Sequence, residues 1–171
     1  QLKHDSLKLK AVNDELKKIG KEFKGSIDVK HFVDVIKDNL DAVKGAITKN
    51  LSGLKVACHP GCHYMRPAEW MESDDPLRPK NLKEIVAATG ATVIDYDQLA
   101  LCCGAAVTNA YQEHGLANLK RKLDSIKKAG ANVICVNCPA CFQQFDTMQR
   151  DLSKKYETDY NIPVLYPVSY T

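Results

Sequence analysis

The sequence predicts an α/β fold: a small parallel sheet of about four strands flanked by helices, preceded by an all-helical N-terminal arm. Beyond residue 53, short β-branched or apolar runs alternate with segments of helical apolar spacing, as in successive βα units. Before it, only the helical spacing occurs. A length of 171 residues suits one well-packed domain, or a domain with an appendage, and 44% hydrophobic with 26% charged residues excludes a disordered or fibrous chain.

The arm is expected to span residues 1–52 and the cysteine-rich α/β domain residues 53–171. An apolar stripe predicts a first helix over 6–23, capped by Asp5 or Ser6 and followed by Gly25. A second helix is predicted over 28–49. Its expected buried side consists of Phe32, Val35, Ile36, Leu40 and Val43.

The domain begins after the Ser52-Gly53 connector, and its elements follow in βα order. Gly90 and Gly130 stand where two of its helices should end, because a residue just past a helix end often adopts a left-handed conformation. Strands are predicted at 54–57, 91–94, 133–136 and 164–166, and helices at 80–89, about 110–129 and 140–156.

Seven cysteines, an odd number, cannot all pair within the chain, which favours a metal or redox site in a reducing compartment over a disulfide framework.

No apolar run approaches the ~20 residues of a membrane span, and the expected location is cytoplasmic. The lysines of the arm are spread along helix faces without aromatic residues between them, so a solvated or protein-docking surface is favoured over nucleic acid.

The cysteines form three groups, each at a predicted strand-to-helix connection. Cys58 and Cys62 follow the first, and Cys102-Cys103-Gly104 follows the second after a short loop. The third strand leads into Cys138-Pro139-Ala140-Cys141, with Cys135 inside the strand itself. Because ligands collect outside the carboxyl ends of parallel strands, these groups are expected to share one site.

The pattern of the cysteines indicates more than one metal ion. Adjacent Cys102 and Cys103 cannot easily chelate a single tetrahedral ion, but they can bind two irons of a cluster. Cys138 and Cys141 at a helix start lie beside free backbone N–H groups, which lower thiol pKa and tune a cluster potential. Two alternatives remain open: structural zinc held by four thiolates, and a dithiol redox motif formed by Cys138 and Cys141 alone.

Other residues near these motifs have weaker claims to a role. Cys58 and Cys135 are expected to be buried and inert, and with His59 they come second as metal ligands. His63 is a weak candidate for a ligand or for donating a hydrogen bond to sulfur. Arg66 could face an anionic substrate or thiol product.

At these positions the sequence resembles the cysteine-rich CCG domain family, whose pattern is a cysteine, a long gap, Cys-Cys-Gly, a similar gap and Cys-x-x-Cys. The matching residues include Cys102-Cys103-Gly104. There are 39 residues between Cys62 and Cys102, and 34 between Cys103 and Cys138. Within the family the chain most resembles the C-terminal half of the B subunits of heterodisulfide reductases, through the segments Gly61-Cys62-His63-Tyr64-Met65-Arg66-Pro67 and Cys138-Pro139-Ala140-Cys141 and through the helical arm.

The resemblance implies an oxidoreductase of methanogenesis with a non-cubane 4Fe–4S cluster, which splits the mixed disulfide of coenzymes M and B. Electrons would come from an iron–sulfur partner subunit within a larger reductase complex. A non-catalytic zinc- or cluster-binding module of a related respiratory or sulfur-oxidising complex is the alternative. These B subunits have two such motifs and this chain has one, so we expect half of a reductase, inactive alone. The ligands implied by the resemblance are Cys62, Cys102, Cys103, Cys138 and Cys141.

Overall fold

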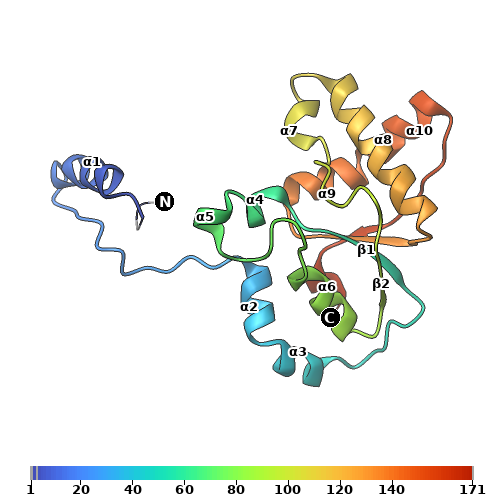
Figure 1. Cartoon of the computed structure of the whole chain (residues 1–171), viewed down its shortest axis with the longest axis horizontal. Helices are drawn as coiled ribbons and strands as arrows, with labels where there is room; N and C mark the ends of the chain where they lie inside the picture. The colour runs from blue at the N-terminus through green and yellow to red at the C-terminus, as the bar shows by residue number, and fades with distance from the viewer. Residues whose placement is uncertain (1, 3, 171) are drawn as a thin grey trace.

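The protein folds as a mixed α/β structure in which helices flank a parallel sheet (Figure 1). The computed structural model describes residues 2 and 4–170. Within those residues the sheet has four strands in the order β2-β1-β3-β4, and every neighbouring pair is parallel. The fold class predicted from the sequence is confirmed. The strands are β1 (Lys55–His59), β2 (Thr92–Ile94), β3 (Val133–Val136) and β4 (Val164–Leu165).

Helices precede the sheet and fill the connections between its strands. The predicted segments 80–89 and 110–129 form helices with bounds close to those expected, whereas 140–156 is divided into two helices at Thr147. Gly90 and Gly130 have positive φ just past the ends of two helices, as predicted. The elements are α1 (Ser6–Lys17), α2 (Phe32–Asp38), α3 (Leu40–Ala46), α4 (Cys62–Met65), α5 (Ala68–Met71), α6 (Asn81–Ala88), α7 (Ala105–Thr108), α8 (Gln112–Lys128), α9 (Pro139–Asp146), α10 (Met148–Tyr156) and the 3₁₀ turn η1 (Pro167–Tyr170).

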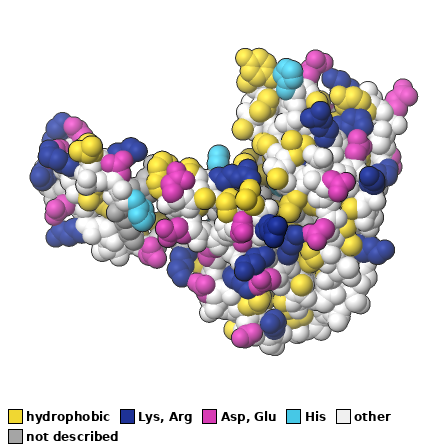
Figure 2. Space-filling view, in the orientation of Figure 1, with side chains coloured by type: hydrophobic (Ala, Val, Ile, Leu, Met, Phe, Trp, Pro, Cys, Tyr) yellow, Lys and Arg dark blue, Asp and Glu magenta, His cyan; other side chains and the backbone are white. Residues whose placement is uncertain are grey.

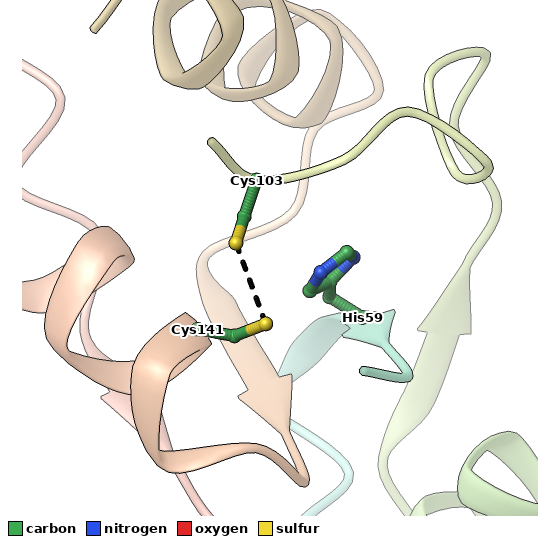
Figure 3. Close-up of side chains that lie close together, drawn as sticks. All are labelled: His59, Cys103 and Cys141. Atoms are coloured by element: carbon green, nitrogen blue, oxygen red, sulfur yellow. Dashed lines mark hydrogen bonds between the residues drawn. The ribbon is translucent and has the colours of Figure 1, made fainter. Parts of the chain in front are cut away.

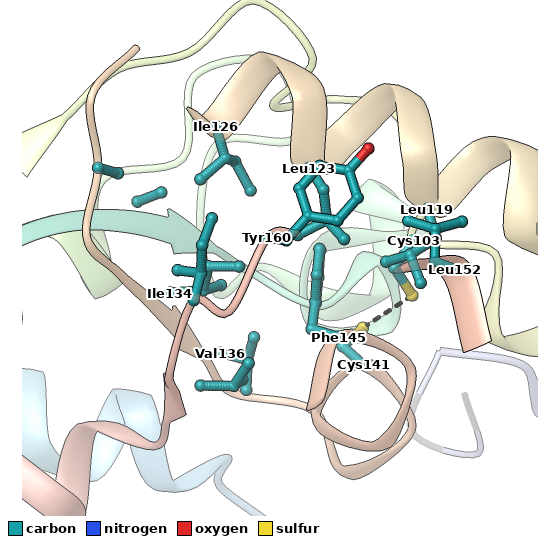
Figure 4. Packing of buried hydrophobic residues seen from close by; sticks show 14 of the residues in the cluster. Cys103, Leu119, Leu123, Ile126, Ile134, Val136, Cys141, Phe145, Leu152 and Tyr160 are labelled. Atoms are coloured by element: carbon teal, nitrogen blue, oxygen red, sulfur yellow. Dashed lines mark hydrogen bonds between the residues drawn. The ribbon is translucent and has the colours of Figure 1, made fainter. Parts of the chain in front are cut away.

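The two faces of the sheet bury separate apolar clusters, because successive strand residues point to opposite faces. One face packs on α8, α9 and α10, and its centre is shown in Figure 4. The other face packs on α6 through Leu82 and Val86. The first cluster contains Ala57, Ile134, Val136, Leu119, Leu123, Phe145 and Leu152, and the second contains Val56, Cys58, Val133 and Cys135.

The first helix of the arm lies to one side of the sheet, as the blue end of the chain in Figure 1 shows, and its Lys8 ammonium lies 5.7 Å from the ring centroid of Trp70 in α5. Asp5 caps α1 by accepting a hydrogen bond from the Lys8 N–H. The helix ends at Lys17, earlier than the predicted 23, and the Asn13 side chain pairs with the backbone of Phe23. The segment after α1 therefore turns back along the helix instead of extending it.

The second predicted helix of the arm differs from the prediction in two ways: it is interrupted, and a different side of it is buried. It is divided at Asn39, whose side chain donates to the Val35 carbonyl oxygen. Val35 is 47% exposed, so its predicted burial is wrong, and Val33 is fully buried in its place. The reason is packing, because Val33 contacts Tyr64 of α4 and Ile85 of α6 in a third small cluster. Where the arm ends and the domain begins stays a prediction.

Within the described part of the chain, no helix combines the length and apolar character that crossing a membrane requires.

Candidate metal and redox site

Three connections bring cysteines to one edge of the sheet. Cys62 opens α4 directly after β1, and Cys102 and Cys103 lie in the loop between β2 and α7. Cys138 is the N-cap of α9 and Cys141 lies in its first turn, after β3. The convergence expected from the carboxyl ends of parallel strands is present.

The buried end of this site consists of Cys103, Cys141 and His59. Their potential ligand atoms all lie within 4.8 Å of one another, and Figure 3 shows the imidazole facing both thiols. The two sulfur atoms are 3.4 Å apart, a hydrogen-bond distance well beyond the ~2.05 Å of a disulfide. This hydrogen bond lowers the pKa of Cys103 and raises that of Cys141.

The other three cysteines lie toward solvent. Cys62 and Cys138 are half-buried and Cys102 is exposed. Burial raises the pKa of Cys62, and the nearby charges of Cys102, Cys103 and Cys138 add to the effect. The five thiols thus lie close enough for their charges to interact. The group is buried at Cys103 and Cys141 and exposed to solvent at Cys102.

His59 lies closer to the cysteines than its second rank among the candidate ligands suggested. It ends β1, and its ring packs edge-on against Phe145 with centroids 5.1 Å apart. Burial lowers its pKa to about 4, so the imidazole is neutral at pH 7. Its Nδ1 is buried without a hydrogen-bond partner. Strand alternation was the available signal, because it turns His59 to the face opposite Cys58.

Two glycines allow the cysteine loops to approach other backbone closely. The Gly61 N–H donates to the Asn137 side chain at 2.5 Å, and a Cβ on Gly61 would lie 2.7 Å from the Cys138 Cβ. Gly104 has a φ of +93°, and a Cβ there would lie 2.6 Å from the Gly115 carbonyl oxygen. Gly104 is therefore required by the left-handed backbone and by close contact with α8.

Cys58 and Cys135 are placed apart from this group. Both lie in the apolar cluster against α6, on the other face of the sheet from Cys103 and Cys141. Burial raises the pKa of the Cys58 thiol to about 12. Such a thiol is protonated at neutral pH. The burial expected for Cys58 and Cys135 is present, and their inertness stays a prediction.

A cavity of about 300 Å³ opens beside the exposed end of the site. Its walls include Cys62, Cys102, Arg66 and Leu77. The exposed Arg66 guanidinium donates to the Pro76 carbonyl oxygen, which orients it along the cavity wall. His63 is exposed and is not among the residues that line this cavity.

The residues at this edge are suited to metal. Thiolates are soft ligands that favour zinc and iron–sulfur centres, and a neutral imidazole is a further donor. The Nδ1 of His59 is buried without a partner, and one ring nitrogen of His59 lies within 4.8 Å of the Cys103 and Cys141 sulfur atoms. Sequence reasoning did not identify Asn137, Gly115 or the buried Lys122, which support the cysteine loops from other elements.

The fold and the site together identify the class of protein. It is a parallel α/β domain with a group of cysteines able to bind metal at the carboxyl edge of its sheet. The chain belongs to the CCG family, described as "Cysteine-rich domain", whose family model matches residues 56–146. It is 39% identical over 170 residues to the B subunit of the ferredoxin:CoB-CoM heterodisulfide reductase of Methanosarcina mazei, covering 97% of this chain and 56% of that protein.

Two further relatives have related names. The B-subunit-like heterodisulfide reductase protein of Archaeoglobus profundus is 36% identical, covering 92% of this chain and 54% of the relative. The 8-methylmenaquinol:fumarate reductase membrane anchor subunit of Wolinella succinogenes is 28% identical, covering 91% of this chain and 55% of the relative. The chain thus spans little more than half the length of these relatives.

One solved structure has the same fold at low sequence identity. It is a hypothetical protein from Helicobacter pylori, which superposes with a TM-score of 0.73 over 99% of this chain and 30% of that one, at 14% identity. This likeness supports the fold alone.

Proposed function

We propose that this chain is the cluster-bearing part of a protein of the heterodisulfide reductase B-subunit type. A non-cubane 4Fe–4S cluster would be held by the five cysteines of the CCG pattern, and such a cluster supplies one-electron redox chemistry at iron. The net reaction takes a disulfide, two electrons and two protons to two thiols. The ligands in this proposal are Cys62, Cys102, Cys103, Cys138 and Cys141.

The observation that carries the proposal is the adjacency of Cys102 and Cys103 within one group of five thiols. Cys103 is buried beside Cys141, whereas Cys102 is exposed at the cavity. Two neighbouring side chains that diverge in this way suit two separate metal centres better than one tetrahedral ion.

The protein's own residues would bind and orient the substrate. The cavity beside Cys102 is roomy enough for a small-molecule disulfide, and Arg66 on its wall would attract an anionic group. On the buried side, Phe145 and neutral His59 keep water from Cys103 and Cys141. The physiological disulfide is proposed to be of the coenzyme M–coenzyme B type, following the names of the relatives.

Electrons would come from an iron–sulfur partner subunit of a reductase complex, also in line with those names. Because the chain spans only about half of its relatives, we propose that disulfide turnover requires the rest of a two-motif protein. A single set of ligands would hold one cluster and exchange an electron with it.

The decisive measurement is iron and acid-labile sulfide per chain after anaerobic reconstitution. About four of each are expected, with visible absorption that decreases on reduction. The double variant Cys102→Ser, Cys103→Ser should lose both, while Cys58→Ala should keep them. A wild-type chain with no iron and no sulfide would refute the proposal.

One observation favours a second candidate, a zinc-binding module. His59, Cys103 and Cys141 form a compact group of three possible ligands, and a fourth thiolate would complete a tetrahedral structural zinc site. This module would dock a partner without catalysis. Stoichiometric zinc without sulfide, kept in Cys102→Ser, would favour it.

A dithiol oxidoreductase acting through Cys138 and Cys141 is the less favoured alternative. Cys141 hydrogen-bonds Cys103 at 3.4 Å, so its thiol has a partner from a different connection. Disulfide reductase activity that survives replacement of Cys102 and Cys103 would support this alternative.

A further inference from the structure

Lys122 of α8 is a charged residue with no exposed surface. Its ammonium group donates three hydrogen bonds to backbone carbonyl oxygens, at 2.6 Å to Gln98, 3.0 Å to Leu99 and 2.6 Å to Leu101. An ammonium has three N–H donors, so all of them are used. The acceptors belong to the turn that leads directly into Cys102 and Cys103.

The turn has other supports as well: the Gln98 N–H donates to the Ser125 hydroxyl of α8 at 3.2 Å, and Leu99 packs against the first apolar cluster. Its own backbone hydrogen bonds join Leu99 N–H to Tyr96 and Leu101 N–H to Gln98. The Gly104 N–H points back to the Cys102 sulfur at 3.4 Å. The residues before Cys102 are therefore held by side chains of a different element, α8, and Lys122 makes three of these hydrogen bonds.

The charge of Lys122 has no carboxylate partner. Within the part of the chain that the structure describes, none of the ion pairs includes it. The Tyr96 ring faces the ammonium at 5.4 Å. The groups whose ionised form would oppose its charge are cysteines, largest first Cys103, Cys141, Cys102 and Cys62.

An unpaired buried charge is costly, so its retention calls for a compensating charge. Thiolates at the cysteine site supply that charge when they hold metal. A fixed positive charge beside a redox centre also stabilises its reduced form, because reduction adds negative charge.

We propose that Lys122 is the positioning residue of the cysteine site: its ammonium holds the 98–101 turn that presents Cys102 and Cys103, and its charge favours reduction of the group bound there. The first role stands on the protein alone. The second rests on the proposed function.

Two variants and a matched control separate these roles. Lys122→Gln keeps N–H donors and removes the charge, whereas Lys122→Met removes both. Lys128→Met changes an exposed lysine of the same helix and controls for its helix position and charge loss.

The first readout is amide hydrogen exchange in the metal-free chain, followed at Leu99, Leu101 and Gly104. Lys122→Met should speed exchange there about tenfold or more, Lys122→Gln should stay near wild type, and Lys128→Met should match wild type. Unchanged exchange in Lys122→Met would overturn the turn-holding role.

The second readout is the midpoint potential of the reconstituted protein. Both Lys122 variants should shift the midpoint potential to more negative values. The expected change is about tenfold in the ratio of reduced to oxidised centre at a fixed solution potential, which corresponds to 59 mV for one electron. A potential equal to that of Lys128→Met would overturn the charge role. If Lys122→Met does not fold, Lys122→Gln carries this comparison.

The two failures can be told apart. A wild-type chain that takes up no iron or sulfide refutes the proposed function, yet the exchange experiment still tests the turn. If the reconstituted chain binds iron and sulfide but its midpoint potential is the same with and without Lys122, only the charge role is refuted.

Discussion

Cys58 and Cys135 are register partners on the neighbouring strands β1 and β3, and both face α6. Cys103 and Cys141 lie on the opposite face of the same sheet, where Figure 4 shows their sulfur atoms side by side. One sheet thus separates an apolar cysteine pair from the cysteines of the candidate site. Strand alternation accounts for the division, since Ala57 and His59 point away from Cys58.

The first prediction concerns this division. Cys58→Ala with Cys135→Ala should bind as much metal as wild type, because neither thiol reaches the candidate site. Loss of packing should lower the free energy of unfolding by about 1 to 2 kcal/mol per site. Iron analysis and urea unfolding measure the two effects. Loss of metal from this well-folded double variant would show that the division does not hold.

His59 and His63 form a matched pair of tests. His59→Ala should reduce metal content or alter the spectrum of the bound group, because a ring nitrogen of this buried residue lies within 4.8 Å of the Cys103 sulfur. His63→Ala should resemble wild type, because that side chain is exposed. Absorption and metal content after reconstitution give the comparison. Identical spectra for the two variants would exclude His59 from the site.

Gly104 is expected to be intolerant of a side chain. Gly104→Ala should lower the free energy of unfolding by at least about 2 kcal/mol, through left-handed strain and the contact with Gly115. Gly53→Ala is the control, because a Cβ there meets nothing within 4 Å. Chemical denaturation of both metal-free variants tests the prediction. Equal stability would mean that α8 does not press on Gly104.

Lys122 should give the metal-free protein a pH-dependent stability. Burial lowers its pKa from 10.5 to about 8, so between these pH values the unfolded chain binds more protons than the native one. The stability of wild type relative to Lys122→Met should therefore rise with pH from about 8 to 10.5. The full gain is on the order of 3 kcal/mol.

Unfolding of the two proteins over that pH range, with reductant and chelator, provides the measurement. Titration of the tyrosines and cysteines is shared by both proteins and largely cancels in the difference. A difference that stays flat or falls with pH would contradict the prediction.

The described surface of α1 carries charges of both signs. Figure 2 shows lysines and acidic residues interspersed over this face of the molecule, with no single-sign patch along α1. Several of these residues form ion pairs three or four positions apart, such as Lys10 with Asp14 and Lys18 with Glu15. Such a pattern is typical of a solvated helix.

The sequence by itself determined the parallel α/β class and the edge at which the cysteines gather. Both follow from local information: strand and helix periods are visible within short windows, and a residue that follows a parallel strand must lie at its carboxyl edge. The placement of Cys62, Cys102 and Cys138 at one edge needed no knowledge of packing.

Only the tertiary structure decided which side chains complete that edge. His59 joins Cys103 and Cys141, Lys122 supports the turn before Cys102, and Gly115 presses on Gly104. In the arm, packing on α6 likewise buried Val33 in place of Val35. Each of these contacts joins separate elements of the fold. Local periodicity carries no record of how two elements pack, so these partners emerge only when the chain is folded.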